Sequence, residues 1–139
     1  MDYRAPTPAA PLIIVAGNVT ALDRTTGSEL WRYPLKGVAR RFALDGDRVF
    51  VFESHGTFHC LELATGRLLG KAETKLESAD NMLVDGDRIY LTDDHHAVAL
   101  DFNGTILWRV PIPSSGTTSL SGLGVPGGNI VQPDFSRAG

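Results

Sequence analysis

The sequence predicts an all-β fold made of a repeated unit of antiparallel strands, and three observations lead to this prediction. Ala21-Leu22-Asp23 is echoed by Cys60-Leu61-Glu62 and by Ala99-Leu100-Asp101, at a spacing of about 40 residues. A turn sequence ending in glycine follows each of the three copies. No stretch of the chain has the periodicity of an amphipathic helix. Repetition at this spacing is typical of a repeat protein.

A second marker gives the same repeat length. Asp45-Gly46-Asp47-Arg48 returns as Asp85-Gly86-Asp87-Arg88, and more loosely as Pro126-Gly127-Gly128-Asn129. The two markers together divide the chain into an extended lead-in and a single domain. We expect the lead-in at residues 1–11 and the domain at residues 12–139, with repeat units at 12–34, 38–72 and 79–111 and a partial unit at 119–132.

The first unit contains three predicted strands. Leu12–Ala16 is a short apolar run of the size of a buried strand. Gly17-Asn18 is a turn signal, Val19–Asp23 is the next strand, and Thr26-Gly27 turns the chain into Glu29–Tyr33. The proline that follows ends this strand, because proline cannot donate to a sheet ladder.

The second unit contains four predicted strands. An Asp-Gly hairpin turn, whose glycine allows a positive φ, separates the first two of them. Four successive apolar residues in the second strand mean that both faces of the sheet are covered, since a sheet with one wet face would alternate. The four strands are Val38–Leu44, Arg48–Glu53, Thr57–Leu63 and Arg67–Ala72.

The third unit repeats this order, and the tail adds two short segments. The predicted strands of the third unit are Ala79–Val84, Arg88–Thr92, His96–Asp101 and Thr105–Val110. Prolines stop the last of these strands. The segments of the tail are Ser119–Leu123 and Asn129–Gln132.

Four strands in about 40 residues, buried on both faces, are typical of a β-propeller blade. The run ALDRTTGSELW also resembles the A-x-D-x-x-T-G-x-x-x-W signature of the pyrroloquinoline-quinone-type propeller repeat. This repeat occurs in quinoprotein dehydrogenases and in the propeller lipoprotein of the outer-membrane assembly machinery. The matching residues are Ala21, Asp23, Thr26, Gly27 and Trp31 in the first unit, Cys60, Glu62, Thr65 and Gly66 in the second, and Ala99, Asp101, Gly104 and Trp108 in the third.

The resemblance covers roughly Leu12–Gln132 and implies structural roles for these residues. It implies that Trp31 and Trp108 dock between adjacent blades, whereas Gly70 stands where the second unit should have its tryptophan. The acidic residues before the turns are expected to support the turns by accepting backbone N–H groups. Quinone-dependent enzymes of this fold use a complete eight-bladed chain with a central calcium site, and this sequence lacks the length and an identifiable ligand set.

The sequence predicts an incomplete ring in one chain, because propellers typically have four to eight blades. The first unit lacks an innermost strand, and Ser119–Leu123 is a strand of the missing kind. We therefore expect a homo-oligomer, preferably a two-fold ring in which Ser119–Leu123 of one chain completes the Leu12–Tyr33 unit of the other. The alternatives are a piece of a longer propeller and an arc that rests on another subunit.

Composition excludes some partners. The chain has 13 basic and 16 acidic residues and a net charge of −3, without a basic stripe, so nucleic acid is not an expected partner. The apolar run Leu12–Ala16 is too short for a signal-peptide core or a membrane span. As given, the chain is predicted to be cytoplasmic; it would be extracytoplasmic if a leader had been removed.

The histidines are the best candidates for a site. His55 and His95 hold equivalent turns, and the second of these turns carries metal-ligand side chains. Turns in adjacent blades lie about 10 Å apart, whereas zinc needs ligands at about 2.0–2.2 Å. We expect solvated turns and no metal site, with Asp93, Asp94, His95 and His96 as weak candidates. His59 is expected to be a packed or edge histidine, and Cys60 to fill a small buried position.

The sequence supports two functional hypotheses. The first is a non-catalytic propeller scaffold that presents a rim of loops, including Ser54–Gly56, Asp93–His96 and Ser114–Thr118, to a protein partner or a larger assembly. No catalytic residue and no cofactor is expected under this hypothesis. The alternative is a small-ligand, quinone or metal site on the ring axis, formed only when the chain oligomerises.

Overall fold

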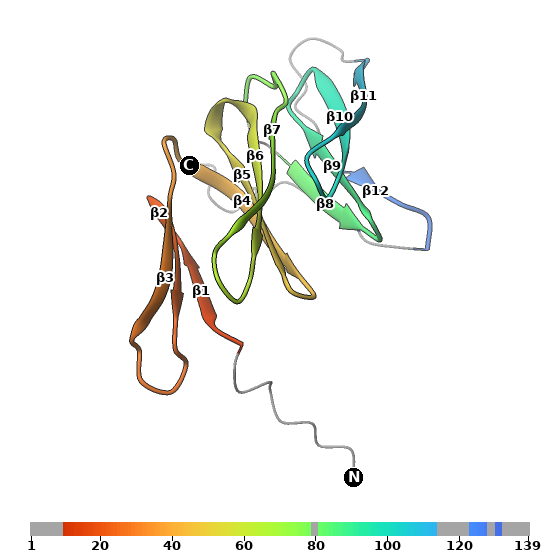
Figure 1. The fold of residues 1–139 in the computed structure, drawn as a ribbon. Coiled ribbons are helices and arrows are strands. Elements are labelled where there is room, and N and C mark those ends of the chain that lie inside the picture. The colour runs from red at the N-terminus through yellow and green to blue at the C-terminus, as the bar shows by residue number, and fades with distance from the viewer. Residues whose placement is uncertain (1–9, 79–80, 114–122, 128–129, 132–139) are drawn as a thin grey trace, which may run out of the picture.

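The computed structural model describes residues 10–78, 81–113, 123–127 and 130–131. Most of these residues lie in antiparallel strands that form three sheets side by side (Figure 1). We call the sheets blades 1, 2 and 3, and the contact between two neighbouring blades a joint. Blade 1 contains β1 (Leu12–Val15), β2 (Asn18–Leu22) and β3 (Glu29–Pro34).

Blades 2 and 3 have four strands each, as the sequence predicts. Blade 2 contains β4 (Ala39–Asp45), β5 (Arg48–Glu53), β6 (Thr57–Glu62) and β7 (Leu68–Glu73). Blade 3 contains β8 (Asn81–Asp85), β9 (Arg88–Thr92), β10 (His96–Asp101) and β11 (Ile106–Pro111). In the described residues the helical content is one 3-10 turn, Ser54–Gly56. The fold is therefore an all-β partial propeller.

A short hairpin follows blade 3. It pairs β12 (Leu123–Gly124) with β13 (Ile130–Val131), and both strands lie beside β8. Of the predicted strand Ser119–Leu123, only Leu123 is described, and it begins β12; the loop Ser114–Thr118 lies outside the described residues. Blade 1 has no counterpart of β4 and β8, so its innermost position is empty among the described strands.

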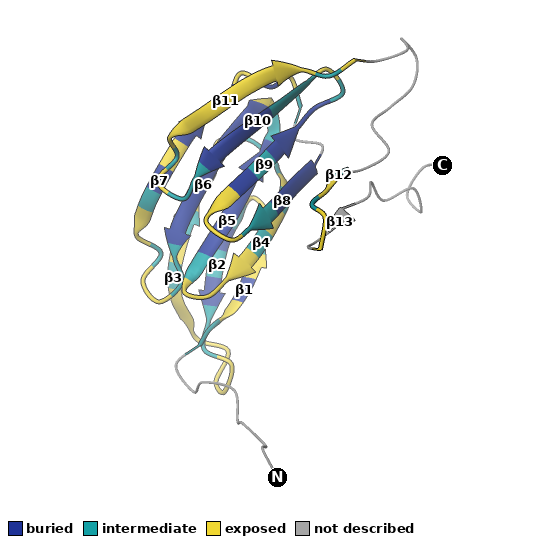
Figure 2. Cartoon of the chain, turned by 90° about the vertical axis from the view of Figure 1, so that its right-hand side faces the viewer, coloured by how far each residue is buried: buried dark blue, intermediate teal, exposed yellow. Residues whose placement is uncertain are grey.

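The core lies in the two joints and not within any one blade. The middle strands β5, β6, β9 and β10 hold most of the buried residues, whereas β11 is exposed along its length (Figure 2). Val49, Phe50, Val51 and Phe52 are fully buried, with alternate side chains entering the joint on either side of blade 2. Each such side chain stabilises the fold by about 1.5–3 kcal/mol, so a blade depends on neighbours on both of its faces.

Candidate functional site

The joint between blades 1 and 2 contains the first tryptophan of the repeat. The Trp31 indole Nε1 donates a hydrogen bond to the Leu63 carbonyl at 3.0 Å. Its ring lies against Gly66, where a Cβ would stand 2.5 Å from ring atoms Cδ2 and Cε3. Gly66 also has a φ of 75°, a conformation that costs glycine little. The turn of blade 2 is thus a flat surface for the tryptophan of blade 1.

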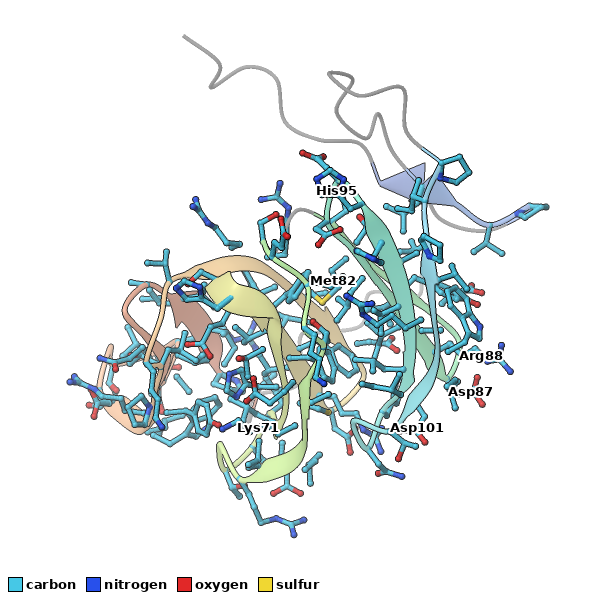
Figure 3. The ribbon with its side chains drawn as sticks, turned by 90° about the horizontal axis from the view of Figure 1, so that it is seen from above. Lys71, Met82, Asp87, Arg88, His95 and Asp101 are labelled. Atoms are coloured by element: carbon cyan, nitrogen blue, oxygen red, sulfur yellow. The ribbon has the colours of Figure 1, made fainter. Side chains whose placement is uncertain are left out.

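The joint between blades 2 and 3 is built differently. Gly70 replaces the tryptophan, and a Cβ there would lie 2.5 Å from the backbone carbonyl of Asn103. A Cβ on Gly104 would lie 2.6 Å from the Lys71 carbonyl oxygen. Lys71 and Asp101 accordingly lie along the same side of the molecule, opposite His95 (Figure 3). At this joint, backbone contacts backbone where the first joint has an indole ring.

Trp108, the second tryptophan of the repeat, lies on the surface of blade 3 that faces away from blade 2. It is 40% exposed, and its ring lies 6.1 Å from the ring of Tyr90 in the same blade, tilted by 34°. Val110, two residues further along β11, is 44% exposed. We call this surface the open face of blade 3; it is formed by Tyr90, Ala97, Trp108 and Val110, around the fully buried Ala99. At one edge, residues 123–126 line a pocket of about 440 Å³ with Tyr90, Ala97 and Trp108.

The acidic residue before each Gly-containing turn binds that turn. Asp23 Oδ1 accepts hydrogen bonds from the backbone N–H groups of Thr25 and Thr26, which hold the pKa of Asp23 below its usual value. Asp101 Oδ1 likewise accepts from the N–H groups of Asn103 and Thr105. The third acidic residue, Glu62, binds its turn in another way.

The longer Glu62 side chain accepts from the Thr65 hydroxyl at 2.5 Å instead of from backbone N–H groups. This hydrogen bond, followed by the nearby charge of Arg67, holds the pKa of Glu62 below its usual value.

A hydrogen-bonded chain of three polar side chains crosses the first joint; Glu53 and His59 are buried, and Tyr33 is half-buried. His59 Nε2 lies 2.8 Å from Glu53 Oε1, and His59 Nδ1 lies 2.9 Å from the Tyr33 hydroxyl. The His59 and Glu53 side chains are only 5% and 6% exposed. An ionised carboxylate can only accept, so His59 Nε2 carries a proton and donates it to Glu53. The other ring nitrogen, Nδ1, is hydrogen-bonded to the Tyr33 hydroxyl.

Electrostatics agree with an ionised Glu53 and a protonated Tyr33 hydroxyl. Burial would raise the pKa of Glu53, but the hydrogen bonds from His59 and from the Gly37 backbone N–H outweigh it and hold the pKa low. Burial, followed by the negative charge of Glu53, raises the pKa of Tyr33, so Tyr33 keeps its proton. The hydrogen bonds among Tyr33, His59 and Glu53 thus join β3 of blade 1 to β6 and β5 of blade 2.

A cavity of about 410 Å³ lies next to these three polar side chains. Tyr33 and Pro34 line it from blade 1, and Glu53, His59 and Glu73 from blade 2. Its volume is within the range of about 300–1,000 Å³ that is usual for small-molecule sites. The polar side chains Tyr33, His59 and Glu53 therefore line a cavity large enough for a small molecule.

The weak metal candidates have other roles or lie apart. Both oxygens of Asp93 are engaged: Oδ1 accepts from the backbone N–H groups of His95 and His96, and Oδ2 accepts from that of Glu77. Burial would raise the pKa of Asp93, but these hydrogen bonds hold it low. His96 Nδ1 lies 3.9 Å from Asp93 Oδ1, and His95 is exposed. Across the described residues, no three His, Cys, Asp or Glu side chains gather as metal ligands.

His55 and Cys60 also have assigned places. His55 is exposed in the 3-10 turn with a φ of 69°, so this predicted candidate lies outside the buried chain. Cys60 is fully buried in the joint between blades 2 and 3. Burial raises the pKa of its thiol to about 11, which suppresses the thiolate needed for nucleophilic chemistry.

The sequence predicts a packed or edge histidine at position 59 but does not indicate its partners. Tyr33, His59 and Glu53 come from three strands of two blades, and they meet only when the joint forms. One signal was available: the same repeat position holds Thr20 and Val98 in the other blades, so a histidine is the exception there.

These blades and joints define a class of protein, a β-propeller built from pyrroloquinoline-quinone-type repeats. Within that class, a family model described as outer membrane protein assembly factor BamB matches residues 15–132. This stretch is most of the chain, and the chain belongs to this family. A search of curated protein sequences finds no match.

Solved structures agree on the fold. The crystal structure of BamB from Moraxella catarrhalis is similar at a TM-score of 0.58 and 23% identity, over 71% of this chain and 33% of that one. A quinohemoprotein alcohol dehydrogenase from Comamonas testosteroni gives a TM-score of 0.59 at 20% identity, over 74% of this chain and 20% of that one. At such identities the likeness shows the fold alone. The chain spans a third or less of the length of these structures.

Europium-containing methanol dehydrogenase is similar at a TM-score of 0.60 and 19% identity, over 73% of this chain and 23% of that one. The similar structures thus include both an assembly factor and quinoprotein enzymes. The described part of the chain contains no helix that is long and apolar enough to cross a membrane.

Proposed function

We propose that this chain is a non-catalytic propeller scaffold that docks further propeller blades, of its own kind or of a larger assembly, through the open face of blade 3. The observation that carries the proposal is the difference between the two tryptophans. Trp31 is packed on a glycine turn with its N–H hydrogen-bonded, whereas Trp108, at the same repeat position, is 40% exposed. A large aromatic side chain on an apolar surface marks an interaction site.

The polar residues support a scaffold as well. Glu53, Asp93, Asp23 and Asp101 all have carboxylate oxygens that hold turns or joints. The family description, outer membrane protein assembly factor, suggests a protein partner in an envelope assembly. It favours the extracytoplasmic alternative for the location of the chain.

Cross-linking in cells of the source organism tests this proposal. The chain is expressed with and without Trp108→Ala, treated with a lysine-reactive cross-linker, purified and analysed by mass spectrometry. We expect cross-links to a polypeptide, a second copy included, that the substitution removes. Leu107→Ala, which truncates a 43% exposed neighbour on β11, is the control. Identical cross-links in all three proteins, or none in any of them, would rule the scaffold out.

A second candidate function is small-ligand binding in the cavity between blades 1 and 2. The observation that favours it is the cavity of about 410 Å³ beside Tyr33 and Glu53, both of which have shifted pKa values. A thermal-shift screen with quinones and divalent metal ions tests it. A rise in melting temperature of several degrees that Tyr33→Phe abolishes would support a ligand site there.

A further inference from the structure

We infer that the open face of blade 3 packs on blade 1 of a second copy of this chain, with Trp108 of one copy on the Thr26-Gly27 turn of the other. This inference rests on the proposed function and names the partner. Within the described residues, the outer surface of blade 1 and the open face of blade 3 pack on no other blade, and each resembles one half of a joint that the structure contains.

The glycine turns show which surface is unfilled. The ring of Trp31 covers Gly66, and the backbone of Lys71 lies against Gly104. At Gly27, the equivalent glycine of blade 1, a Cβ would meet nothing within 4 Å, although the φ of 77° is the same conformation. Of the three signature glycines Gly27, Gly66 and Gly104, Gly27 is therefore the one without a covering residue, and of the two signature tryptophans, Trp108 is the one without a turn beneath it.

The surface around Gly27 repeats the surface that Trp31 covers. In blade 2, the β5–β6 register sets Val49 opposite Leu61, and both side chains lie in the joint with blade 1. In blade 1, the β1–β2 register sets Leu12 opposite Leu22 at the same positions. Leu12 is 49% exposed and Ile14, two residues further on, is 43% exposed. The outer surface of blade 1 thus offers the apolar residues that receive a neighbouring blade.

The open face of blade 3 repeats the opposite side of a joint. In blade 1, Ile13, Ala21 and Trp31 form one row across the three strands and face blade 2. In blade 3 the same row is Tyr90, Ala99 and Trp108. Each of the two end surfaces therefore matches one half of a joint that this chain already forms.

Two copies related by a two-fold axis can satisfy both surfaces at once. Each copy supplies one tryptophan and one glycine turn, so the same contact forms twice and no surface is left over. Among the described strands, blade 1 also has no innermost strand, and β12 lies beside β8, the innermost strand of blade 3. In the dimer, β12 pairs with β1 of the second copy, and this β1 replaces the two-residue strand β13 as the partner of β12.

Light scattering on the purified chain over a range of concentrations tests the inference. We expect a mass twice that of one chain, and at least about a tenfold weaker dimer with Gly27→Ala or Trp108→Ala. A Cβ on Gly27 would enter the ring of Trp108 as one on Gly66 would enter the ring of Trp31. Gly46→Ala is the matched control, because Gly46 also has a positive φ, of 61°, and nothing within 4 Å. Circular dichroism shows that each variant is folded.

Mixing the two variants tests the direction of the contact. A heterodimer of a Gly27→Ala copy and a Trp108→Ala copy retains one intact tryptophan–glycine contact. We therefore expect the mixture to dimerise more strongly than either variant alone. A concentration-independent monomer, equal effects of Gly27→Ala and Gly46→Ala, or no gain on mixing would each overturn the inference. If the chain is a monomer but still loses cellular cross-links with Trp108→Ala, the inference fails and the scaffold stands.

Discussion

His59 differs from its counterparts in the other blades because it has hydrogen-bonding partners on both sides. Glu53 orients it from within blade 2, and Tyr33 reaches it from blade 1. If His59 lost one of these partners, one of its ring nitrogens would be buried without a hydrogen bond, which is destabilising. The chain of three side chains therefore favours one registration of blade 1 on blade 2, in addition to the apolar packing around Trp31.

Tyr33→Phe tests the contribution of this chain to stability. The substitution keeps the ring but removes the hydroxyl and leaves Nδ1 of His59 unpaired, so we expect unfolding to cost about 1–3 kcal/mol less. Urea denaturation followed by tryptophan fluorescence measures the change. Tyr90→Phe, on the open face of blade 3, is the control and should change stability by less than about 0.5 kcal/mol. Equal effects of the two substitutions would contradict a role for the hydroxyl in the joint.

Among the elements, most strands and the docking of Trp31 on blade 2 were predictable, whereas the polar contacts across the joints were not. Arg48–Glu53, Arg88–Thr92 and His96–Asp101 are strands with the predicted bounds, because turn residues with fixed backbone requirements flank continuous apolar runs. The buried polar chain depends on which side chains face each other across two blades. That information lies in the register of strands far apart in the sequence, so the pattern of histidines pointed to the exposed His55 and His95 instead.

Substitutions at Gly70 test whether the residue at this position of the second joint is determined by the repeat signature or by the backbone that lies against it. The signature has tryptophan at this position, yet a Cβ would lie 2.5 Å from the Asn103 backbone. We expect Gly70→Ala to destabilise the chain by about 1–3 kcal/mol, and Gly70→Trp to destabilise it further. Gly17→Ala is the matched control, since a Cβ there meets nothing within 4 Å. Urea denaturation measures all three, and a stabilising Gly70→Trp would contradict the close backbone approach.

At the scale of the whole molecule, blades 2 and 3 each have a buried carboxylate that binds the backbone just before the first strand of that blade. Glu53 accepts the backbone N–H of Gly37, and Asp93 accepts that of Glu77. Both pKa values are lower in the folded chain than in the unfolded one. The ionised forms therefore stabilise the fold above about pH 5, and this stabilisation is lost as the pH falls through the folded-state pKa values.

We accordingly expect Asp93→Asn to lower the unfolding free energy at about pH 7 and to lower it progressively less as the pH approaches 3. As the pH falls through the folded-state pKa of Asp93, the wild-type carboxylate takes up a proton and its advantage over the amide is lost, so the two proteins converge. Denaturation curves collected across this pH range measure the difference. Asp45→Asn, which changes an exposed carboxylate, serves as the comparison and should show no such convergence. A difference for Asp93→Asn that is independent of pH would exclude the carboxylate as its cause.

The unlike construction of the two joints has a consequence for the order of the blades. An indole ring on a glycine turn and a bare backbone contact cannot replace each other without a clash or a void. The three units are therefore not interchangeable modules: a gene in which the second and third were transposed would encode mismatched surfaces. The difference at one repeat position, where Gly70 stands instead of tryptophan, thus determines which blade can follow blade 2. It allows only one order of the otherwise similar blades.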